Sequence, residues 1–485
     1  MEPNSRSEAG VIRLSASETP GYTHVDNITD RSAQKASDLL TANHDVFHTR
    51  FNGGLHNHLV HHILAIYALG ATPDEIQDMW NDNISYQAPL EPPSDPATPP
   101  RNLKDPAVFN ECLGKDECYS DFLRFFEDEV TQKGVPDVVN EYVFKGDDRA
   151  NDIFCRMFTD LVHPLIHLGC ALEFSQPSLV AESLAAACVH GAWPASVLLP
   201  TETYLQSHPD TPSVPLLSVL SALRADPNIS TAVKPTDPFN KIPDGLLVRI
   251  PPAVFAPYLA SYRVSPDPDS LRDALSDLIH TCVYMTGAAQ HPDKLVAMDF
   301  VLLHSVTVLA FYPAVMQIPW ISDASKARLL EATGRIAAVM YAGCRCPELY
   351  PSRITAYLPK YPEHGWEELA HRSNVYQDEG HVAKFTRAML ALEKHVPMGA
   401  LERDFPIGKK DFFKIAHMGV DSAERAFEEP EKGGHKMPEG VAEGVVKRVG
   451  LGGEMVAKNQ MRWVFYGGLE GAWGWVANRD EVSKA

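Results

Sequence analysis

Three histidines crowd one short stretch of the chain, at the start of an apolar run. The segment NHLVHHILAIYALGA places His58, His61 and His62 at positions i, i+3 and i+4, so the three imidazoles share one face of a helix. Neutral imidazole is a common metal ligand, and it also transfers protons near neutral pH. The stretch therefore indicates a metal site or an acid–base site in the wall of a hydrophobic core, although each histidine taken singly also fits a structural role.

Histidines stand on two further apolar segments. His163 and His167 are spaced i, i+4 in DLVHPLIHLGCALEF. Pro164 in that segment predicts a kink, because proline lacks the backbone donor and disfavours helical geometry at the residue before it. His304 lies in the middle of FVLLHSVTVLAFYPAVMQI, where an imidazole is costly unless its nitrogens are bonded. A protein partner such as Thr307, one turn on, or a metal would satisfy it.

A fourth segment, DEGHVAKFTRAMLALEKH, carries His381 and Lys384. These two residues share one stripe of the predicted helix with alanines, whereas Glu379, Arg387 and Lys394 are expected on the solvated side. Lys384 is then either a surface lysine that extends past the alanines or a buried amine. A buried neutral amine can capture carbon dioxide as a carbamate, and that would supply the anionic ligand that a set of histidines lacks.

Together the four segments indicate a metal centre assembled between helices, as in other helical folds. Iron, copper, zinc and nickel all accept imidazole ligands, so the residues leave the identity of the metal open. The choice among the first-helix histidines also stays open. We expect four rings to converge on one ion, with Lys384 as a carbamate ligand or a nearby cation; the four are His58, His163, His304 and His381.

The elements that position these residues are predicted to be helices, because apolar residues recur at helical spacing along most of the chain. The predicted helices span 56–70, 73–82, 154–174, 178–190, 271–287, 293–312, 323–343 and 379–395. Thr72 and Pro73 are typical of a helix start, and only short pieces such as LLVRI (246–250) resemble strands. We predict an all-α protein: an N-terminal lead (1–50), one large helical metal-binding catalytic domain (51–400) and a C-terminal extension packed on it (401–485), with a flexible loop at 428–440.

Composition excludes several classes of function. The chain has 485 residues and a formal net charge of −20, which argues against binding to nucleic acid or to an anionic membrane. The eight cysteines lack the paired spacing of a zinc knuckle, and together with the polar N-terminal stretch they predict reduced thiols in a cytoplasmic protein. The apolar stretch 300–318 is expected to be a buried core helix and not a membrane span.

Other catalytic motifs are weaker. His291 and Asp293 have the spacing of an iron facial triad, but they open the predicted helix 293–312, where an aspartate is expected as a cap. The stretch GLGGEM (450–455) is not a dinucleotide fingerprint and follows no clear strand. The chain contains no Walker A, nucleophile-elbow or H-E-x-x-H motif.

Four segments resemble the questin oxidase-like family of fungal secondary metabolism: FNGGLHNHLVHHILAIYALGATPDEIQ, HPLIHLGCALEF, LLHSVTVLAFYPAV and GHVAKFTRAML. The resemblance covers about residues 20 to 480. It implies oxidative opening of an anthraquinone-type polyketide ring by molecular oxygen. Members are described both as NADPH-dependent Baeyer–Villiger-like oxidases and as non-haem iron oxygenases. The recurring polar positions of the family correspond here to His58, His61, His163, His304, His381 and Lys384, whereas His62 and His167 are less regular and are expected beside the ligands.

The resemblance and the histidine pattern together favour a mechanism with Fe(II) held by His58, His163, His304 and His381. His61 is the predicted catalytic residue, which takes a phenolic proton or orients a ligand. The partners are a small aromatic polyketide and molecular oxygen, and the oligomeric state stays open. The alternatives are a metal-free oxidase that uses NADPH, with histidines as acids and bases, and a non-catalytic helical scaffold.

Overall fold

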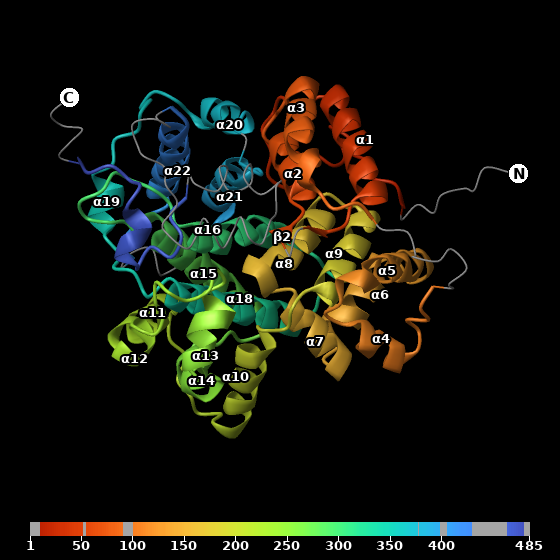
Figure 1. Ribbon diagram of the computed structural model, residues 1–485, viewed down its shortest axis with the longest axis horizontal. Coiled ribbons are helices and arrows are strands. Elements are labelled where there is room, and N and C mark those ends of the chain that lie inside the picture. The colour runs from red at the N-terminus through yellow and green to blue at the C-terminus, as the bar shows by residue number, and fades with distance from the viewer. Residues whose placement is uncertain are drawn as a thin grey trace, which may run out of the picture. The chain divides into compact units, whose positions relative to one another are not determined.

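The computed structural model describes residues 10–51, 55–90, 100–376, 378–397, 405–428 and 463–479 (Figure 1). Within these residues helices predominate and one short pair of strands occurs, so the all-α prediction is confirmed. The chain divides into two compact units. Unit 1 comprises Met1–Pro194, Gln317–Ile321 and Asn374–Arg387, and unit 2 comprises Ala195–Met316, Ser322–Ser373 and Ala388–Ala485. These bounds differ from the ranges 1–50, 51–400 and 401–485, and the single-domain organisation stays a prediction.

Unit 1 is built around α2, a helix that is buried at every position from Leu59 to Ala68. It packs on α1, α3 and α8, while α9 contacts both α5 and α8 (Figure 1). The helices of this unit are α1 (Asp30–Val46), α2 (Leu59–Ala68), α3 (Pro73–Asn83), η2 (Ile84–Tyr86), α4 (Pro106–Cys112), η3 (Asp116–Cys118), α5 (Tyr119–Lys133), α6 (Val135–Val139), η4 (Asn140–Phe144), α7 (Asp148–Arg156), α8 (Thr159–Glu173) and α9 (Pro177–Val189).

Two short strands that the sequence did not predict come directly before α2. They are β1 (Arg50–Phe51) and β2 (Leu55–His56), an antiparallel pair in which Arg50 lies opposite His56. The pairing fixes the direction in which the chain enters α2. It therefore also fixes the position of His58, the N-cap residue of that helix.

Unit 2 has α15 near its centre, where that helix contacts α16, α18, α19 and α22. The helices are α10 (Ala195–Ser207), α11 (Leu216–Ala225), α12 (Pro227–Ser230), η5 (Ile242–Leu246), α13 (Leu247–Arg249), α14 (Pro252–Ala260), α15 (Pro268–Ala288), α16 (Phe300–Thr307), η6 (Val308–Phe311), α17 (Tyr312–Val315), α18 (Asp323–Gly343), α19 (Pro351–Thr355), α20 (Trp366–Asn374), α22 (Lys410–Glu428) and η8 (Glu470–Trp473). Helix α21 (His381–His395) begins in unit 1 and ends in unit 2.

Local sequence signals fix several helix ends. Thr72 caps α3 with a reciprocal capping box to Glu75, and Pro73 occupies the first turn, as predicted. Helix α18 occupies the predicted range 323–343, with Ser322 as its N-cap. In both places a side-chain oxygen accepts from a backbone N–H group that would otherwise have no partner.

Three expectations need correction or fall outside the described chain. The predicted helix 293–312 is wrong at its start, because Asp299 accepts from the amides of Val301 and Leu302 and so begins α16 at Phe300. Asp293 therefore caps no helix. The strand-like piece 246–250 is helical, in η5 and α13. The loop predicted at 428–440 and the stretch 450–455 lie outside the described residues, apart from position 428 at the end of α22.

Two further expectations concern the apolar stretch 300–318 and the cysteines. Every residue of α16, within the apolar stretch 300–318, is buried. No helix among the described residues is long and apolar enough to cross a membrane. All eight cysteines lie in described parts of the chain, and each is buried and free.

Candidate metal centre

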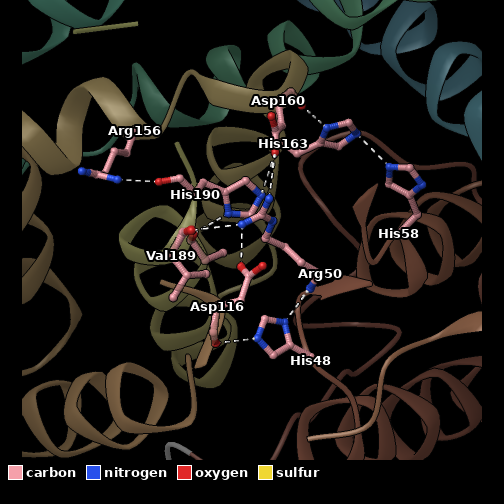
Figure 2. A network of polar contacts seen from close by, with 10 residues as sticks. His48, Arg50, His58, Asp116, Arg156, Asp160, His163, Val189 and His190 are labelled. Atoms are coloured by element: carbon pink, nitrogen blue, oxygen red, sulfur yellow. Dashed lines mark hydrogen bonds and ion pairs between the residues drawn. The ribbon is translucent and has the colours of Figure 1, made fainter. Parts of the chain in front are cut away.

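Three of the predicted ligands come together in unit 1. The ligand nitrogens of His58, His163 and His381 all lie within 4.8 Å of one another, and all three side chains are buried. We call these residues the first histidine group. The Nε2 atoms of His58 and His163 are 2.8 Å apart (Figure 2). Two nitrogens bound to one ion at a right angle, each about 2.1 Å from it, would be about 3.0 Å apart.

The other ring nitrogen of each histidine in this group contacts an oxygen. Nδ1 of His58 lies 2.9 Å from Oε2 of Glu379, and Nδ1 of His381 lies 2.7 Å from the carbonyl of Asp378. Nδ1 of His163 donates to the carbonyl of Asp160. A carbonyl acceptor holds the proton on Nδ1 and leaves the lone pair on Nε2, which is the arrangement that surrounds metal-bound histidines.

Ring separations in the first histidine group fit a shared ion. Two imidazoles on one ion, with bonds of about 2.1 Å, have centroids about 4.6 Å apart at a right angle and about 5.3 Å apart at the tetrahedral angle. The centroid of His58 lies 4.7 Å from that of His163 and 4.9 Å from that of His381. Both separations are close to the right-angled case, which octahedral or square-pyramidal coordination requires.

His163 follows a distorted turn in the backbone of α8. Asp160, Leu161 and Val162 have φ values of 45°, 57° and 62°, so α8 is interrupted directly before His163. Pro164 then lies in the first turn of the second segment, where proline is tolerated. The predicted kink is confirmed, one residue earlier in the chain than expected. A left-handed conformation at a β-branched residue is unfavourable, and such strain persists only where neighbouring contacts hold it.

Polar contacts hold the distorted turn in place (Figure 2). The carboxylate of Asp160 lies 3.6 Å from Nε2 of His190 and 4.0 Å from the guanidinium of Arg50. Arg50 itself is fixed by Asp116 at 2.5 Å and by the carbonyl of Val189 at 3.0 Å. These contacts connect β1, α8 and the end of α9, and they position the carbonyl that accepts from His163.

His381 is the first residue of α21 and follows a left-handed turn at Glu379 (φ 59°) and Gly380 (φ 77°). A Cβ atom at Gly380 would lie 2.4 Å from Cγ of His62, so no larger residue fits there without displacing that ring. Because the helix begins only at His381, Glu379 does not lie on its outer face. The expectation that Glu379 and Arg387 are solvated is wrong: both are buried, and Arg387 pairs with Glu173.

Lys384 is buried, on the turn of α21 that follows His381. Burial lowers the pKa of its amine to about 8, against the opposing charges of Asp378 and Glu379. Burial also lowers the pKa of His163 to about 3, and the charge of Lys384 adds to that shift. The pKa of His58 is lowered well below its usual value by the same two causes. The imidazoles of His58 and His163 are therefore neutral near neutral pH, as metal ligands must be.

The carboxyl group of Glu379, which was expected on the surface, also belongs to this site. Glu379 is buried beside His58, and burial raises the pKa of its carboxyl to about 8 against the charge of Lys384. A bound cation would lower that pKa again and favour the carboxylate that accepts from His58. Asp378 and Glu379 stand three and two residues before His381 in the sequence, and that position was the signal available for them.

The remaining predicted site residues lie elsewhere. His304 belongs to unit 2, where it lies on α16 with Nδ1 2.6 Å from the carbonyl of Phe300, so its part in the metal site stays a prediction. His61 lies on α2 with a different set of histidines. His62 is buried beside Gly380, and burial lowers its pKa to about 3. Among the described residues neither nitrogen of His62 has a hydrogen-bond partner.

A second histidine group was not predicted. His56, His61 and His167 are buried and place one ligand nitrogen each within 4.8 Å of the others. Nε2 of His167 lies 3.0 Å from Oε2 of Glu182 on α9. Glu182 is the lone carboxylate in the apolar helix predicted at 178–190, which was a signal that the sequence offered.

His44 connects Glu182 with Glu127 on α5. Its Nδ1 lies 2.5 Å from Glu182 and its Nε2 lies 2.7 Å from Glu127. Burial alone would lower the pKa of His44, but hydrogen bonds to both carboxylates outweigh it and raise the pKa from 6.5 to about 10. Burial alone would raise the pKa of Glu182, but hydrogen bonds from His167 and His44 lower it to about 2. His44 is thus an imidazolium between two carboxylates.

Replacing His44 with glutamine is expected to lower the free energy of unfolding by about 3 kcal/mol, because it leaves Glu182 buried with one cationic partner fewer. The contribution of a group whose pKa is raised on folding is fully present below the unfolded pKa of 6.5 and is lost as the pH rises through about 10. Chemical denaturation should therefore show that the difference in free energy of unfolding between the wild type and His44→Gln shrinks from pH 6 to pH 10. A difference that stays constant over this pH range would contradict the charged state of His44. The control variant His208→Gln, at an exposed position, should show no pH-dependent difference from the wild type.

Comparison with known proteins shows which family the chain belongs to. The model of the questin oxidase-like family matches residues 55–389, which contain both histidine groups. The chain is 42% identical over 476 residues to the Oxidoreductase AflY of Aspergillus parasiticus, covering 97% of this chain and 94% of that protein. It is 34% identical to a Questin oxidase of Aspergillus fumigatus (82% and 90% covered) and 32% identical to the Baeyer-Villiger oxidase ptaJ of Pestalotiopsis fici (86% and 94% covered). The chain therefore belongs to the questin oxidase-like family of oxidoreductases.

Proposed function

We propose that this protein is a non-haem iron oxygenase that cleaves an anthraquinone-type ring with molecular oxygen in fungal secondary metabolism. The observation that supports the proposal best is the convergence of three buried imidazoles, each with its Nδ1 against an oxygen atom. The donor set fits a divalent ion of the class that prefers nitrogen ligands. Near-right-angled ring separations favour iron over a tetrahedral ion.

The ion would be held by His58, His163 and His381, with His304 as the further histidine and Lys384 as a carbamate. Lys384 supports the carbamate role because it is buried, and burial lowers the pKa of its amine to about 8, which favours the neutral amine that captures carbon dioxide. An anionic carbamate would offset the charge of the ion where neutral imidazoles cannot. Glu379 would orient His58 and supply further negative charge.

Iron(II) at this position would supply the one-electron chemistry that molecular oxygen requires. The protein residues would keep water away from the site, since every member of the first histidine group is buried. They would also keep the ligands unprotonated through burial, which lowers the pKa of His58 and of His163. The predicted role of His61 as proton acceptor is not carried into this proposal, because that ring belongs to the second histidine group.

A second candidate is a metal-free Baeyer–Villiger oxidase that uses NADPH. It is favoured by the name of the relative from Pestalotiopsis fici. The chain carries no dinucleotide fingerprint for the cofactor. In this alternative the first histidine group would act as acids and bases, and the contact between the Nε2 atoms of His58 and His163 would be a hydrogen bond.

The experiment uses purified protein, questin as the test anthraquinone, and isotopically labelled oxygen gas. We expect a ring-opened product that carries labelled oxygen, formed without NADPH, abolished by an iron chelator and restored by Fe(II). Turnover that needs NADPH and survives chelation would establish the second candidate. No turnover of questin or of other hydroxylated anthraquinones by iron-loaded protein would refute the proposed substrate class.

A further inference from the structure

We infer that His56, His61 and His167 form a second metal site, separate from the first histidine group and selective for an ion of near-tetrahedral geometry such as Zn²⁺. The three residues come from β2, α2 and α8, all within unit 1. The inference does not depend on the proposed function, because it concerns different ligands. It gives His61 the role of a ligand in place of the proton acceptor expected from the sequence.

Ring separations distinguish this site from the first one. The centroid of His61 lies 5.1 Å from that of His56 and 5.2 Å from that of His167, and the centroids of His56 and His167 are 5.9 Å apart. Imidazoles bound to one tetrahedral ion have centroids about 5.3 Å apart, whereas a right angle gives about 4.6 Å. Two of the three separations are close to the tetrahedral value and the third is wider, so this group fits a tetrahedral ion better than a right-angled one.

The nitrogens of this group need a partner that the described residues do not supply. Neither ring nitrogen of His56 or His61 has a hydrogen-bond partner among those residues, although both rings are buried. A buried polar atom without a partner is destabilising. A neutral imidazole has one nitrogen with a free lone pair. A cation with affinity for neutral imidazole satisfies both lone pairs at once.

The third ligand is oriented by a carboxylate. Nε2 of His167 lies 3.0 Å from Oε2 of Glu182. A proton on that nitrogen would leave the lone pair of the ring on Nδ1. The negative charge of Glu182 is fixed in turn by His44, at 2.5 Å. A carboxylate behind a metal-bound histidine is a common arrangement in zinc sites, where it sets the tautomer and raises the basicity of the ring.

The two sites are neighbours within unit 1. The ring of His56 stacks on that of His163, with centroids 5.0 Å apart and planes inclined by 15°. The charge of Lys384 contributes to the lowered pKa of His61 as well as to that of His58. Ions in both sites would repel each other electrostatically. Each histidine group has one carboxyl group in contact with it: Glu182 contacts His167, and Glu379 contacts His58.

Metal content tests the inference directly. Full-length protein is purified, loaded with Fe(II) and Zn²⁺, freed of loosely bound ions, and analysed by mass spectrometry. We expect two ions per chain for the wild type and for the control His48→Gln. The variants His56→Ala and His167→Gln should each retain one ion, which should be iron. The variant His381→Ala should also retain one ion, which should be zinc. A wild type with one ion per chain that both His56→Ala and His167→Gln retain would overturn the second site, whatever the fate of the first.

Cobalt spectroscopy tests the geometry of the two sites directly. Tetrahedral Co(II) absorbs visible light far more strongly than octahedral Co(II). Apo protein titrated with cobalt should develop strong bands for one equivalent and weak bands for another. The strong bands should be absent from His56→Ala and present in His381→Ala. Only weak bands in the wild type, or strong bands that persist in His56→Ala, would overturn the second site.

Discussion

Replacing His381 with alanine is expected to remove iron from the first histidine group and to lower ring-cleaving turnover by more than about 100-fold. Loss of a residue that only supports a ligand typically costs 10- to 100-fold in affinity or activity, so loss of a ligand should cost more. The removed ring is one of three whose nitrogens lie within 4.8 Å of one another. Iron content and initial rates, measured on the same preparation, check the prediction.

A matched control lies on the same helix. His395 is the last residue of α21, and His395→Ala removes an imidazole without touching either histidine group. It should keep full iron content and turnover. Glu379→Gln is the intermediate case, because the amide keeps a contact with Nδ1 of His58 but loses the charge. Its iron affinity should fall by about 10- to 100-fold. Full iron content in His381→Ala would contradict the assignment of this residue.

The second large effect is expected at Lys384. If its amine is a carbamate ligand, Lys384→Ala should lose both iron and turnover, and added bicarbonate should restore neither. Lys384→Glu should retain part of both, because a carboxylate replaces the charge of the carbamate but not its reach. The measurements are iron per chain and turnover, together with the mass of the intact protein under conditions that preserve carbamates.

Two further variants separate the possible roles of this lysine. If Lys384 is instead a free cation near the substrate, Lys384→Arg should keep iron and much of the turnover, and the carbamate role would be refuted. Lys394→Ala, on the exposed side of the same helix, is the control and should change stability by no more than about 0.5 kcal/mol. Full iron content and full turnover in Lys384→Ala would refute both roles.

Much of the fold could be predicted because its signals are local. The periodic spacing of apolar residues predicted α18 over its full length, and Thr72 with Pro73 predicted the start of α3. The start of α16 was missed because Asp299, six residues beyond the predicted start at 293, forms the cap. Either of two nearby aspartates could be the N-cap residue, and the periodicity of apolar residues does not show which of them accepts from the first backbone amides of the helix.

The site was predicted less completely, since it depends on contacts between distant residues. His58, His163 and His381 were found because each stands on an apolar segment. His56 was missed because it lies in the short strand β2, before α2 begins at Leu59, although the predicted helix 56–70 included it. Glu379 was misplaced on a solvated helix face, because the left-handed turn that starts α21 only at His381 has no periodic signature.

The most direct test of the metal centre is a crystal structure of iron-loaded protein with anomalous data collected on both sides of the iron absorption edge. We predict one peak specific to iron, about 2.0–2.3 Å from the Nε2 atoms of His58, His163 and His381. The electron density of Lys384 should extend beyond the amine as a carbamate toward that peak. An iron-loaded crystal with no such peak, and with Nε2 of His58 hydrogen-bonded to Nε2 of His163, would contradict the proposed iron centre.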